Sequence, residues 1–295
     1  MVASVTPRRG GAQAGREGVM DEIEPGIRRL TAPNPSPMTF TGTQSYVVGA
    51  GREVAVIDPG PAHEGHIAAL LAGIGGARVA AILVTHTHLD HSPGAALLKG
   101  ATGAEVLAFG PHGAGKSAQM RALAEAGADL GGGEGADRDF VPDRCLADGA
   151  AVQGDGWRLE AVHTPGHLSN HLAFALATPG GTVVFTGDAV MGWATTLVSP
   201  PEGDMAAQMT TLRRLAGRGD RRFLPGHGVP VEGPAALLAE HIAHREARRQ
   251  ALVAALGEGP GSAETLTPGL YAGTPPALMR AAARNVFATL LQLEA

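Results

Sequence analysis

An apolar run that ends in four potential metal ligands constrains this chain more than any other feature. Residues 79–91 read VAAILVTHTHLDH, and the first part of this segment is typical of a buried strand. Side chains two positions apart on an extended segment point to the same side, so His86, His88 and Asp90 form a partial metal cage. His91 joins them if the chain turns there. The segment therefore predicts a metal site at the end of a buried strand.

A second group of histidines lies in the segment HTPGHLSNH, which places His163, His167 and His171 at intervals of four. On a helix these side chains would line one face, but the Pro-Gly pair in the middle is incompatible with that helix. A loop is the better interpretation. Only one or two of the three histidines can then face the same metal.

Two further potential ligands follow apolar runs of their own. Asp188 comes directly after the buried strand pattern in VVFTGD, and His227 follows another in FLPGHG. Each is weak evidence alone, because an aspartate after a strand is often a turn cap and a single histidine is often structural. A succession of strand ends that each carry a ligand type indicates one shared site.

The rest of the chain alternates strand and helix patterns and opens as β-β-α-β. Strands are expected over residues 45–49, 53–60, 79–86, 157–163, 171–177, 182–188 and 222–227, and helices over 63–74, 116–127, 205–217, 233–256 and 276–295. This pattern divides the chain into a flexible tail (1–20), a catalytic domain (21–232) and a long helix followed by a small helical unit (233–295).

The order H-x-H-x-D-H, then P-G-H, then G-D, then P-G-H resembles the metallo-β-lactamase-fold hydrolases. The resemblance implies an α/β fold, an αββα sandwich, with a dinuclear metal site at one edge. It assigns His86, His88 and His167 to one metal, Asp90, His91 and His227 to the second, and Asp188 to a bridge between them. Asp58 in VIDPG would support the metal-binding loop without ligating, and His163 and His171 would either support the ligands or be structural residues.

Within these hydrolases, three segments are similar to the β-lactamase-like protein 2 branch. They are APNPSPMTFTGTQSYVVG near the start, HIAHREARRQ in the long helix and AARNVFATLLQLE at the end. This resemblance implies that residues 233–295 contain a truncated winged-helix-like unit. It also implies an activity, because the branch cleaves single-stranded RNA.

Nitrogen and oxygen ligands of this kind suit Zn²⁺, and carboxylates also tolerate Mn²⁺ or Fe²⁺. Two such ions can share one water, lower its pKa to near 7 and act on both the attacked and the leaving group. We therefore expect a zinc-dependent hydrolase that uses a metal-bridging hydroxide. Asp90 would orient that hydroxide as well as bind a metal.

The substrate is less sharply defined by the sequence. A phosphodiester such as single-stranded RNA is slightly preferred, and five arginines in the last two long helices could form a local basic face for it. These are Arg245, Arg248, Arg249, Arg280 and Arg284. The alternative is a thioesterase or lactonase similar to glyoxalase II. β-Lactamase activity should be weak, because dedicated β-lactamases tend to carry Cys or Ser where this chain has Asp188.

Residues 110–117, from Gly110 to Ser117, spell G-x-x-x-x-G-K-S, the pattern of a loop that binds nucleotide phosphates. Such a loop needs a Mg²⁺-holding acid on another strand, and Asp188 is already assigned to the metals. In a chain with 43 glycines, a chance match is unsurprising. Nucleotide binding therefore stays a distant alternative, and Lys116 is expected to be exposed on a flexible loop.

Composition limits the setting. The formal net charge of −5 gives no global attraction to RNA or to anionic lipid, and no run of eighteen apolar residues predicts a membrane span. Cys145 is the only cysteine, which excludes an internal disulfide and is consistent with a reducing compartment. A cytoplasmic location is therefore expected.

Overall fold

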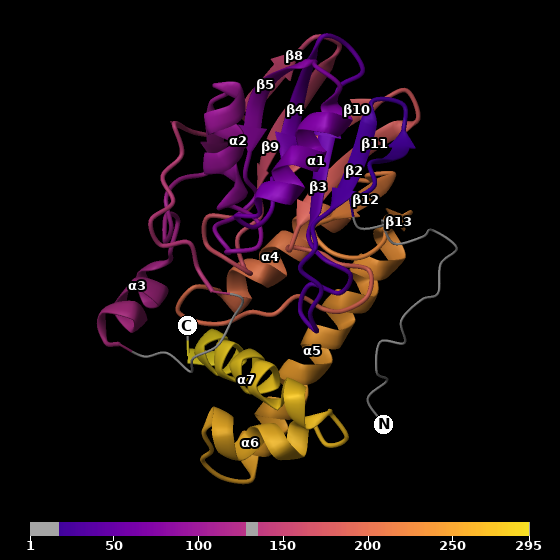
Figure 1. Ribbon diagram of the computed structural model, residues 1–295. Helices are drawn as coiled ribbons and strands as arrows, with labels where there is room; N and C mark the ends of the chain where they lie inside the picture. Colours follow the sequence, from indigo (N-terminus) through magenta and orange to yellow (C-terminus); the bar gives the residue numbers. More distant parts are fainter. Residues whose placement is uncertain (1–17, 128–134, 295) are drawn as a thin grey trace.

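The computed structural model describes residues 18–127 and 135–294, and these form two β-sheets stacked face to face with helices on both outer surfaces (Figure 1). One sheet has the strand order β1 (Asp21–Glu24), β2 (Ile27–Thr31), β3 (Gln44–Val48), β4 (Glu53–Ile57), β5 (Arg78–Leu83), β6 (Val106–Ala108), β7 (Arg144–Cys145). The other has the order β13 (Val231–Glu232), β12 (Arg222–Pro225), β11 (Gly181–Gly187), β10 (Leu172–Thr178), β9 (Trp157–His163), β8 (Ala151–Gly154).

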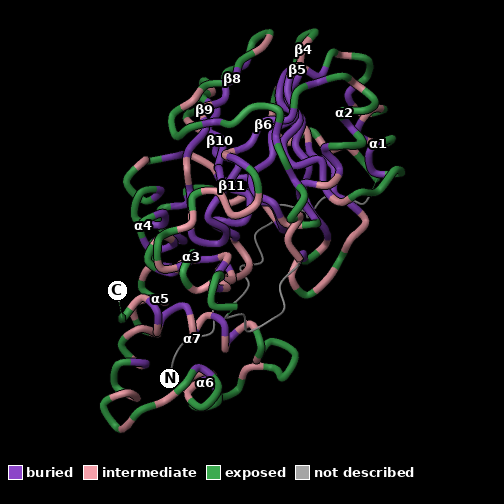
Figure 2. The backbone as a smooth tube through the Cα atoms, turned by 90° about the vertical axis from the view of Figure 1, so that its left-hand side faces the viewer, coloured by how far each residue is buried: buried purple, intermediate pink, exposed green. Residues whose placement is uncertain are grey.

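Three apolar layers hold these elements together. Ile57 and Phe174 belong to the core between the sheets. Helices α1 (Glu64–Ile74) and α2 (Gly94–Thr102) cover the outer face of the first sheet, while α4 (Met205–Ala216) and α5 (Ala235–Gly257) cover that of the second. Burial is concentrated along the strands (Figure 2). The predicted αββα sandwich is confirmed.

The central strands are apolar on both faces because each separates two of these layers. In β11, Phe185 packs in the core between the sheets, and the adjacent Val184 packs in the layer beneath α4 and α5. This double burial explains why VVF shows no polar alternation. The same reasoning applies to Leu83 and Ile82 in β5.

Parallel pairing determines where the site can form. Strand β5 pairs parallel with both β4 and β6, and β11 pairs parallel with β12. The carboxyl ends of β4 and β5 therefore meet at one edge of the first sheet, and those of β11 and β12 meet at one edge of the second. The backbone joins the two edges, because Gln44 N donates to the Gly226 carbonyl at 2.7 Å.

Beyond β13, the described part of the chain contains helices and their connections but no strand. Helix α5 leads into α6 (Ala263–Leu270), a 3₁₀ turn (Pro276–Leu278) and α7 (Met279–Glu294). Leu252, Ala263 and Val286 form a small core among α5, α6 and α7. Helix α7 also packs against α4 of the sandwich. None of the described helices is both long enough and apolar enough to cross a membrane.

Several elements differ from the sequence predictions. Strands β1, β2, β7, β8 and β13 and helix α2 were not predicted, since β7 and β13 have only two residues each, and charged residues in β2 and small residues in α2 obscure their periodicity. The strand predicted over residues 79–86 ends at Leu83, so the chain has left the sheet before the ligand segment. Cys145 is exposed in β7. The predicted tail (1–20) falls mostly on residues 1–17, which lie outside the described part of the chain.

Candidate metal centre

The first group of potential ligands gathers where β5, the loop after β9 and the end of β11 meet. His86 Nε2 lies 3.0 Å from His88 Nδ1, and His167 Nε2 lies 2.9 Å from the same atom. Asp188 Oδ2 lies 3.9 Å from His86 Nε2 and 3.6 Å from His167 Nε2. One ligand atom from each of the four residues lies within 4.8 Å of the others. A single metal ion fits among these atoms.

The second group lies beside the first. Asp90 Oδ2 is 3.2 Å from both His91 Nε2 and His227 Nε2, and the two imidazole nitrogens are 3.2 Å apart. These three atoms come from the segment after β5 and from the loop after β12. They form a second candidate group that could hold one metal ion.

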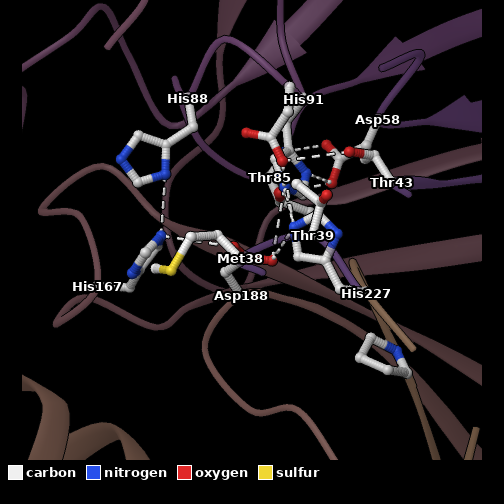
Figure 3. A network of polar contacts seen from close by, with 12 residues as sticks. Met38, Thr39, Thr43, Asp58, Thr85, His88, His91, His167, Asp188 and His227 are labelled. Carbon is white, nitrogen blue, oxygen red and sulfur yellow. Dashed lines mark hydrogen bonds and ion pairs between the residues drawn. The ribbon is translucent and has the colours of Figure 1, made fainter. Parts of the chain in front are cut away.

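Asp188 lies between the two groups, with His88 and His167 on one side and His91 and His227 on the other (Figure 3). Its Oδ2 faces the first group, as given above, while its Oδ1 lies 3.5 Å from His91 Nε2 and 3.4 Å from His227 Nε2. One carboxylate therefore presents one oxygen to each group. This is the geometry that a bridging ligand requires.

Asp58, at the end of β4, organises the loop that carries the first ligands. Its carboxylate accepts hydrogen bonds from Thr85 N at 2.7 Å, from Thr85 Oγ1 at 2.7 Å and from His91 Nδ1 at 2.9 Å. Thr85 Oγ1 in turn lies 2.9 Å from His86 Nδ1. Asp58 thus directs Nε2 of His91 towards the site and, through Thr85, does the same for His86. Its contacts are those of a supporting residue.

Partners outside the ligand motifs fix the remaining ligands. His167 Nδ1 donates to the Leu197 carbonyl at 2.7 Å, and His227 Nδ1 lies 3.4 Å from the Gly42 carbonyl. Thr43 Oγ1 donates to Asp90 Oδ2 at 3.2 Å. Sequence reasoning missed the roles of Thr43, Thr85 and Leu197, because threonines and backbone carbonyls carry no pattern that distinguishes them from structural ones.

The protonation pattern suits cation binding. Burial, with the neighbouring His167, lowers the pKa of His88 to about 3, and burial also lowers the pKa of His86 and His167. These imidazoles are therefore neutral and can donate lone pairs. For His227, burial works against protonation, but the carboxylates of Asp188 and Asp90 prevail and raise its pKa to about 9. A metal cation would replace the proton that balances these carboxylates.

Carboxylate oxygens without hydrogen-bond partners also favour cation binding. Asp90 and Asp188 are 7% and 5% exposed, yet Oδ1 of each has no hydrogen-bond partner among the described residues. An ionised oxygen buried without a partner is costly unless it binds a cation. Gly226 permits the close approach on this side, since a Cβ there would lie 2.6 Å from Asp188 Oδ1 and 2.7 Å from His91 Cε1. The residues present therefore fit a pair of metal ions.

The two histidines expected to support the ligands differ. His171 Nε2 accepts a hydrogen bond from Asp188 N at 3.1 Å, and its ring stacks on that of His86 at 5.0 Å. His163 instead lies 3.0 Å from the Ser169 carbonyl through Nε2 and stacks on Phe109 at 4.1 Å. His171 thus contacts two candidate ligands, whereas the hydrogen bonds and ring contact of His163 involve none of them.

A pocket of about 810 Å³ opens onto the first metal group. His88, His167 and Asp188 line one part of it, and α7 of the C-terminal unit lines another. Much of the wall between them is apolar: Met38, Leu168, Met191, Trp193, Leu197 and Leu278. The pocket is large enough for a small organic substrate with a sizeable apolar part.

The segment with the phosphate-loop pattern, residues 110–117, is held in place by other protein groups. It follows the parallel strand β6 and precedes helix α3 (Ala118–Glu125), but its side chains bind other protein groups. Lys116 Nζ lies 2.8 Å from Glu202 Oε2, and its side chain is only 11% exposed. Ser117 Oγ caps α3 and donates to Asp204 Oδ2 at 3.0 Å. The expectation of an exposed Lys116 is wrong, because Glu202 pairs with it.

Of the five arginines considered for RNA, Arg280 alone is exposed and Arg249 is half-buried, so the five do not form one exposed basic face. Arg245 and Arg284 are 7% and 6% exposed, since both lie in the packing among the C-terminal helices. Arg248 donates to the Leu270 carbonyl and covers the ring of Tyr271 at 4.1 Å. Arg249 pairs with Glu246. The structure therefore removes the arginine argument for an RNA substrate.

Comparisons with known proteins agree with this geometry. Residues 38–227 match the model of the metallo-beta-lactamase superfamily. The atrochrysone carboxyl ACP thioesterase of Aspergillus fumigatus is 30% identical over 242 residues, covering 80% of this chain and 67% of that relative. The beta-lactamase-like protein 2 homolog of Drosophila melanogaster is 30% identical over 299 residues, covering 92% and 90%.

Solved structures extend the likeness to the whole architecture. A metallo-beta-lactamase family protein from Thermus thermophilus superposes with a TM-score of 0.73 at 29% identity, covering 92% of this chain and 94% of its own. A beta-lactamase domain protein from Burkholderia ambifaria gives a TM-score of 0.77 at 25% identity, covering 96% and 89%. Both alignments include most of the C-terminal unit.

Proposed function

Because the chain belongs to the metallo-β-lactamase superfamily of hydrolases, we propose that it is a dinuclear zinc hydrolase acting on small ester or thioester substrates. The observation that carries the metal part is the position of Asp188, whose two carboxylate oxygens face the two ligand groups separately. The nitrogen and oxygen donors suit Zn²⁺ first, and Mn²⁺ or Fe²⁺ next.

In this proposal the seven candidate ligands divide as the geometry groups them. His86, His88 and His167 hold one ion, and Asp90, His91 and His227 hold the other, with Asp188 shared. Two ions bound there would lower the pKa of a shared water to near 7 and polarise the bond under attack.

Asp90 has a second role as the catalytic residue. Its Oδ2 lies against the two histidines of its group, while its Oδ1 is free to accept a hydrogen bond from the attacking water. Its nearby histidines outweigh the effect of burial and hold the pKa of its carboxyl well below the usual range, so it remains ionised. Asp90 would thereby orient the water towards the substrate carbonyl.

The preference for esters or thioesters rests on three observations. The pocket wall is largely apolar, the arginines do not form an exposed basic face, and relatives that share 30–31% identity with this chain are named thioesterases. Attack on a thioester carbonyl breaks the C–S bond and yields a carboxylic acid and a thiol. A phosphodiester substrate stays the second candidate, because the likeness to the beta-lactamase-like protein 2 homologs covers 92–93% of the chain.

A substrate panel tests the proposal. Zinc-loaded protein is incubated with an acyl-N-acetylcysteamine thioester, a lactone, single-stranded RNA, a bis-phosphodiester reporter and a cephalosporin, with Asp90→Ala as the blank. We expect turnover of the thioester or the lactone well above the blank. Cleavage of RNA and the reporter, with the thioester and the lactone left intact, would overturn the substrate assignment while leaving the metal assignment in place.

A further inference from the structure

The segment HIAHREARRQ of α5 places a buried cation against the loop that follows β11. Arg245 is 7% exposed, and one of its guanidinium nitrogens donates to the Thr196 carbonyl. The other terminal nitrogen donates to Asn285 Oδ1 of α7 at 3.1 Å. Arg245 thus joins α5, α7 and the loop at one point.

Asn285 holds the same loop two residues further on. Its Oδ1 also accepts a hydrogen bond from Val198 N at 3.1 Å. Between the two anchored positions lies Leu197, whose carbonyl accepts the 2.7 Å hydrogen bond from His167 Nδ1. The two helices therefore form hydrogen bonds to the backbone on both sides of the Leu197 carbonyl, which orients His167.

The same loop is also bonded to the backbone of Asp188, the residue whose carboxylate is the candidate bridge. Thr196 Oγ1 donates to the Asp188 carbonyl at 2.8 Å and to the Ala189 carbonyl at 3.1 Å. One short segment, residues 196–198, is therefore bonded at one side to the C-terminal helices and at the other to His167 and Asp188. Hydrogen bonds, and not only apolar packing, connect the C-terminal helices to His167 and to the backbone of Asp188.

A charge at position 245 is costly if packing is its only purpose. Arg245 has no carboxylate partner within ion-pair distance among the described residues, and burial lowers its pKa to about 10. An apolar side chain would fill such a position at lower cost, because the guanidinium gives up hydration for neutral acceptors. What the guanidinium adds is a planar donor that spans two fixed acceptors, the Thr196 carbonyl and Asn285 Oδ1.

We propose that Arg245 and Asn285 are positioning residues through which the C-terminal helices fix the Leu197 carbonyl and thereby aim Nε2 of His167 at the first metal. The inference rests on the metal assignment proposed above. In this inference the C-terminal helices contribute to metal binding by orienting His167. Loss of such a partner of a ligating histidine typically weakens metal binding by about 10- to 100-fold.

The test measures zinc affinity by competition with a chromophoric chelator, together with the number of ions bound per chain. Asn285→Ala leaves the Leu197 carbonyl in place and removes only its support, so it should bind one of its two zinc ions about 10-fold more weakly than the wild type, the lower end of that range. Asn285→Asp keeps an oxygen that can accept both hydrogen bonds, so it should retain near wild-type affinity. Arg245→Lys replaces the guanidinium, which donates through two nitrogens, by a single ammonium group. This variant should also have a lower affinity for the same zinc ion.

The control is Val286→Ala, which truncates a neighbouring buried side chain of α7 that faces the small core with Leu252 and Ala263. It should lower thermal stability without changing zinc affinity. Equal loss of affinity in Val286→Ala and Asn285→Ala would show a general effect of helix packing and overturn the inference. So would unchanged affinity in both Asn285→Ala and Arg245→Lys. A wild-type protein that binds no metal would instead defeat the proposed function itself.

Discussion

Residues 86–91 and 110–117 each follow a parallel strand of the same sheet, and each matches a known ligand-binding pattern, but they have opposite fates. The first segment delivers its side chains to a place where Asp188 and His227 arrive from the other sheet. In the second segment other protein groups already bind the key side chains, since Lys116 forms an ion pair with Glu202 and Ser117 donates a hydrogen bond to Asp204. A short pattern therefore acquires its chemistry from what distant segments bring to it.

The two segments also differ in charge balance. Around residues 86–91 the carboxylates of Asp90 and Asp188 retain oxygens without hydrogen-bond partners. Around residues 110–117, the single carboxylate of Glu202 meets Lys116 at 2.8 Å, His112 at 3.1 Å and Arg138 at 3.9 Å. The first environment has unsatisfied anionic oxygens and fits cations, whereas the carboxylate of the second is already paired with Lys116.

Removal of the shared carboxylate should have the largest effect. Asp188→Ala deletes the oxygens that face both groups, so kcat/KM should fall by about 10³-fold or more, the scale at which loss of electrostatic stabilisation acts. Asp204→Ala, which changes a residue in contact with the other segment, is the matched control, and its kcat/KM should fall by less than about tenfold. Steady-state kinetics on the thioester or lactone measure both. Comparable losses in the two variants would contradict the distinction.

A smaller effect is expected from the residue that organises the ligand loop. Asp58→Asn keeps the size of the side chain but removes the acceptor for one of its donors, Thr85 or His91. Zinc affinity should fall by about 10- to 100-fold, because the imidazoles lose their fixed orientation. Competition with a chelator gives the affinity, and circular dichroism verifies the fold. Unaltered affinity in a folded variant would remove Asp58 from the account.

Smaller still is the expected effect of changing the phosphate-loop lysine. Lys116→Ala should alter kcat/KM by less than tenfold, because its ammonium group binds Glu202 and no candidate metal ligand. ATP should neither bind the wild-type protein in calorimetry nor protect residues 110–117 from proteolysis. Protection by ATP that disappears in the Lys116 variant would restore the nucleotide-binding alternative.

The last effect concerns stability and pH. Burial alone would raise the pKa of Glu202, but His112 and Lys116 outweigh it and lower the pKa to about 2. A lowered carboxyl pKa stabilises the fold above the unfolded value of about 4.5 and ceases to do so as pH falls towards 2. Glu202→Gln should thus lower the free energy of unfolding by about 1–2 kcal/mol at pH 7, after solvent screening.

Denaturant unfolding of the wild type and Glu202→Gln across pH 3–7 measures this difference, which should shrink as the solution becomes more acid. A difference that is constant with pH would mean that packing, and not the ionised carboxylate, holds the segment in place.

Patterns of ligands at strand ends made much of the fold and the metal centre predictable. The family resemblance rests on residues such as His86 and Asp188, and the resemblance in turn implied the sandwich and the grouping of the candidate ligands. What the sequence could not show was contact between distant segments. Glu202 lies 86 positions from Lys116, and nothing in its surroundings marks it as that lysine's partner.

The C-terminal arginines illustrate the same limit. Arg245 and Arg284 read as candidates for a basic surface, yet packing of α5 against α7 buries both. Helical periodicity predicts that one face is covered but does not say which neighbour covers it. The hydrogen bonds of Arg245 to Thr196 and Asn285 therefore became visible only in three dimensions.

Metal analysis of the purified protein shows whether the two ligand groups bind a pair of ions. Elemental analysis after dialysis in buffer with a stoichiometric excess of Zn²⁺ should find close to two ions per chain in the wild type and fewer in Asp188→Ala, with Lys116→Ala retaining two. Chelation should abolish hydrolysis, and added zinc should restore it. A wild-type chain that binds no divalent ion, and gains no activity from any, would contradict the account.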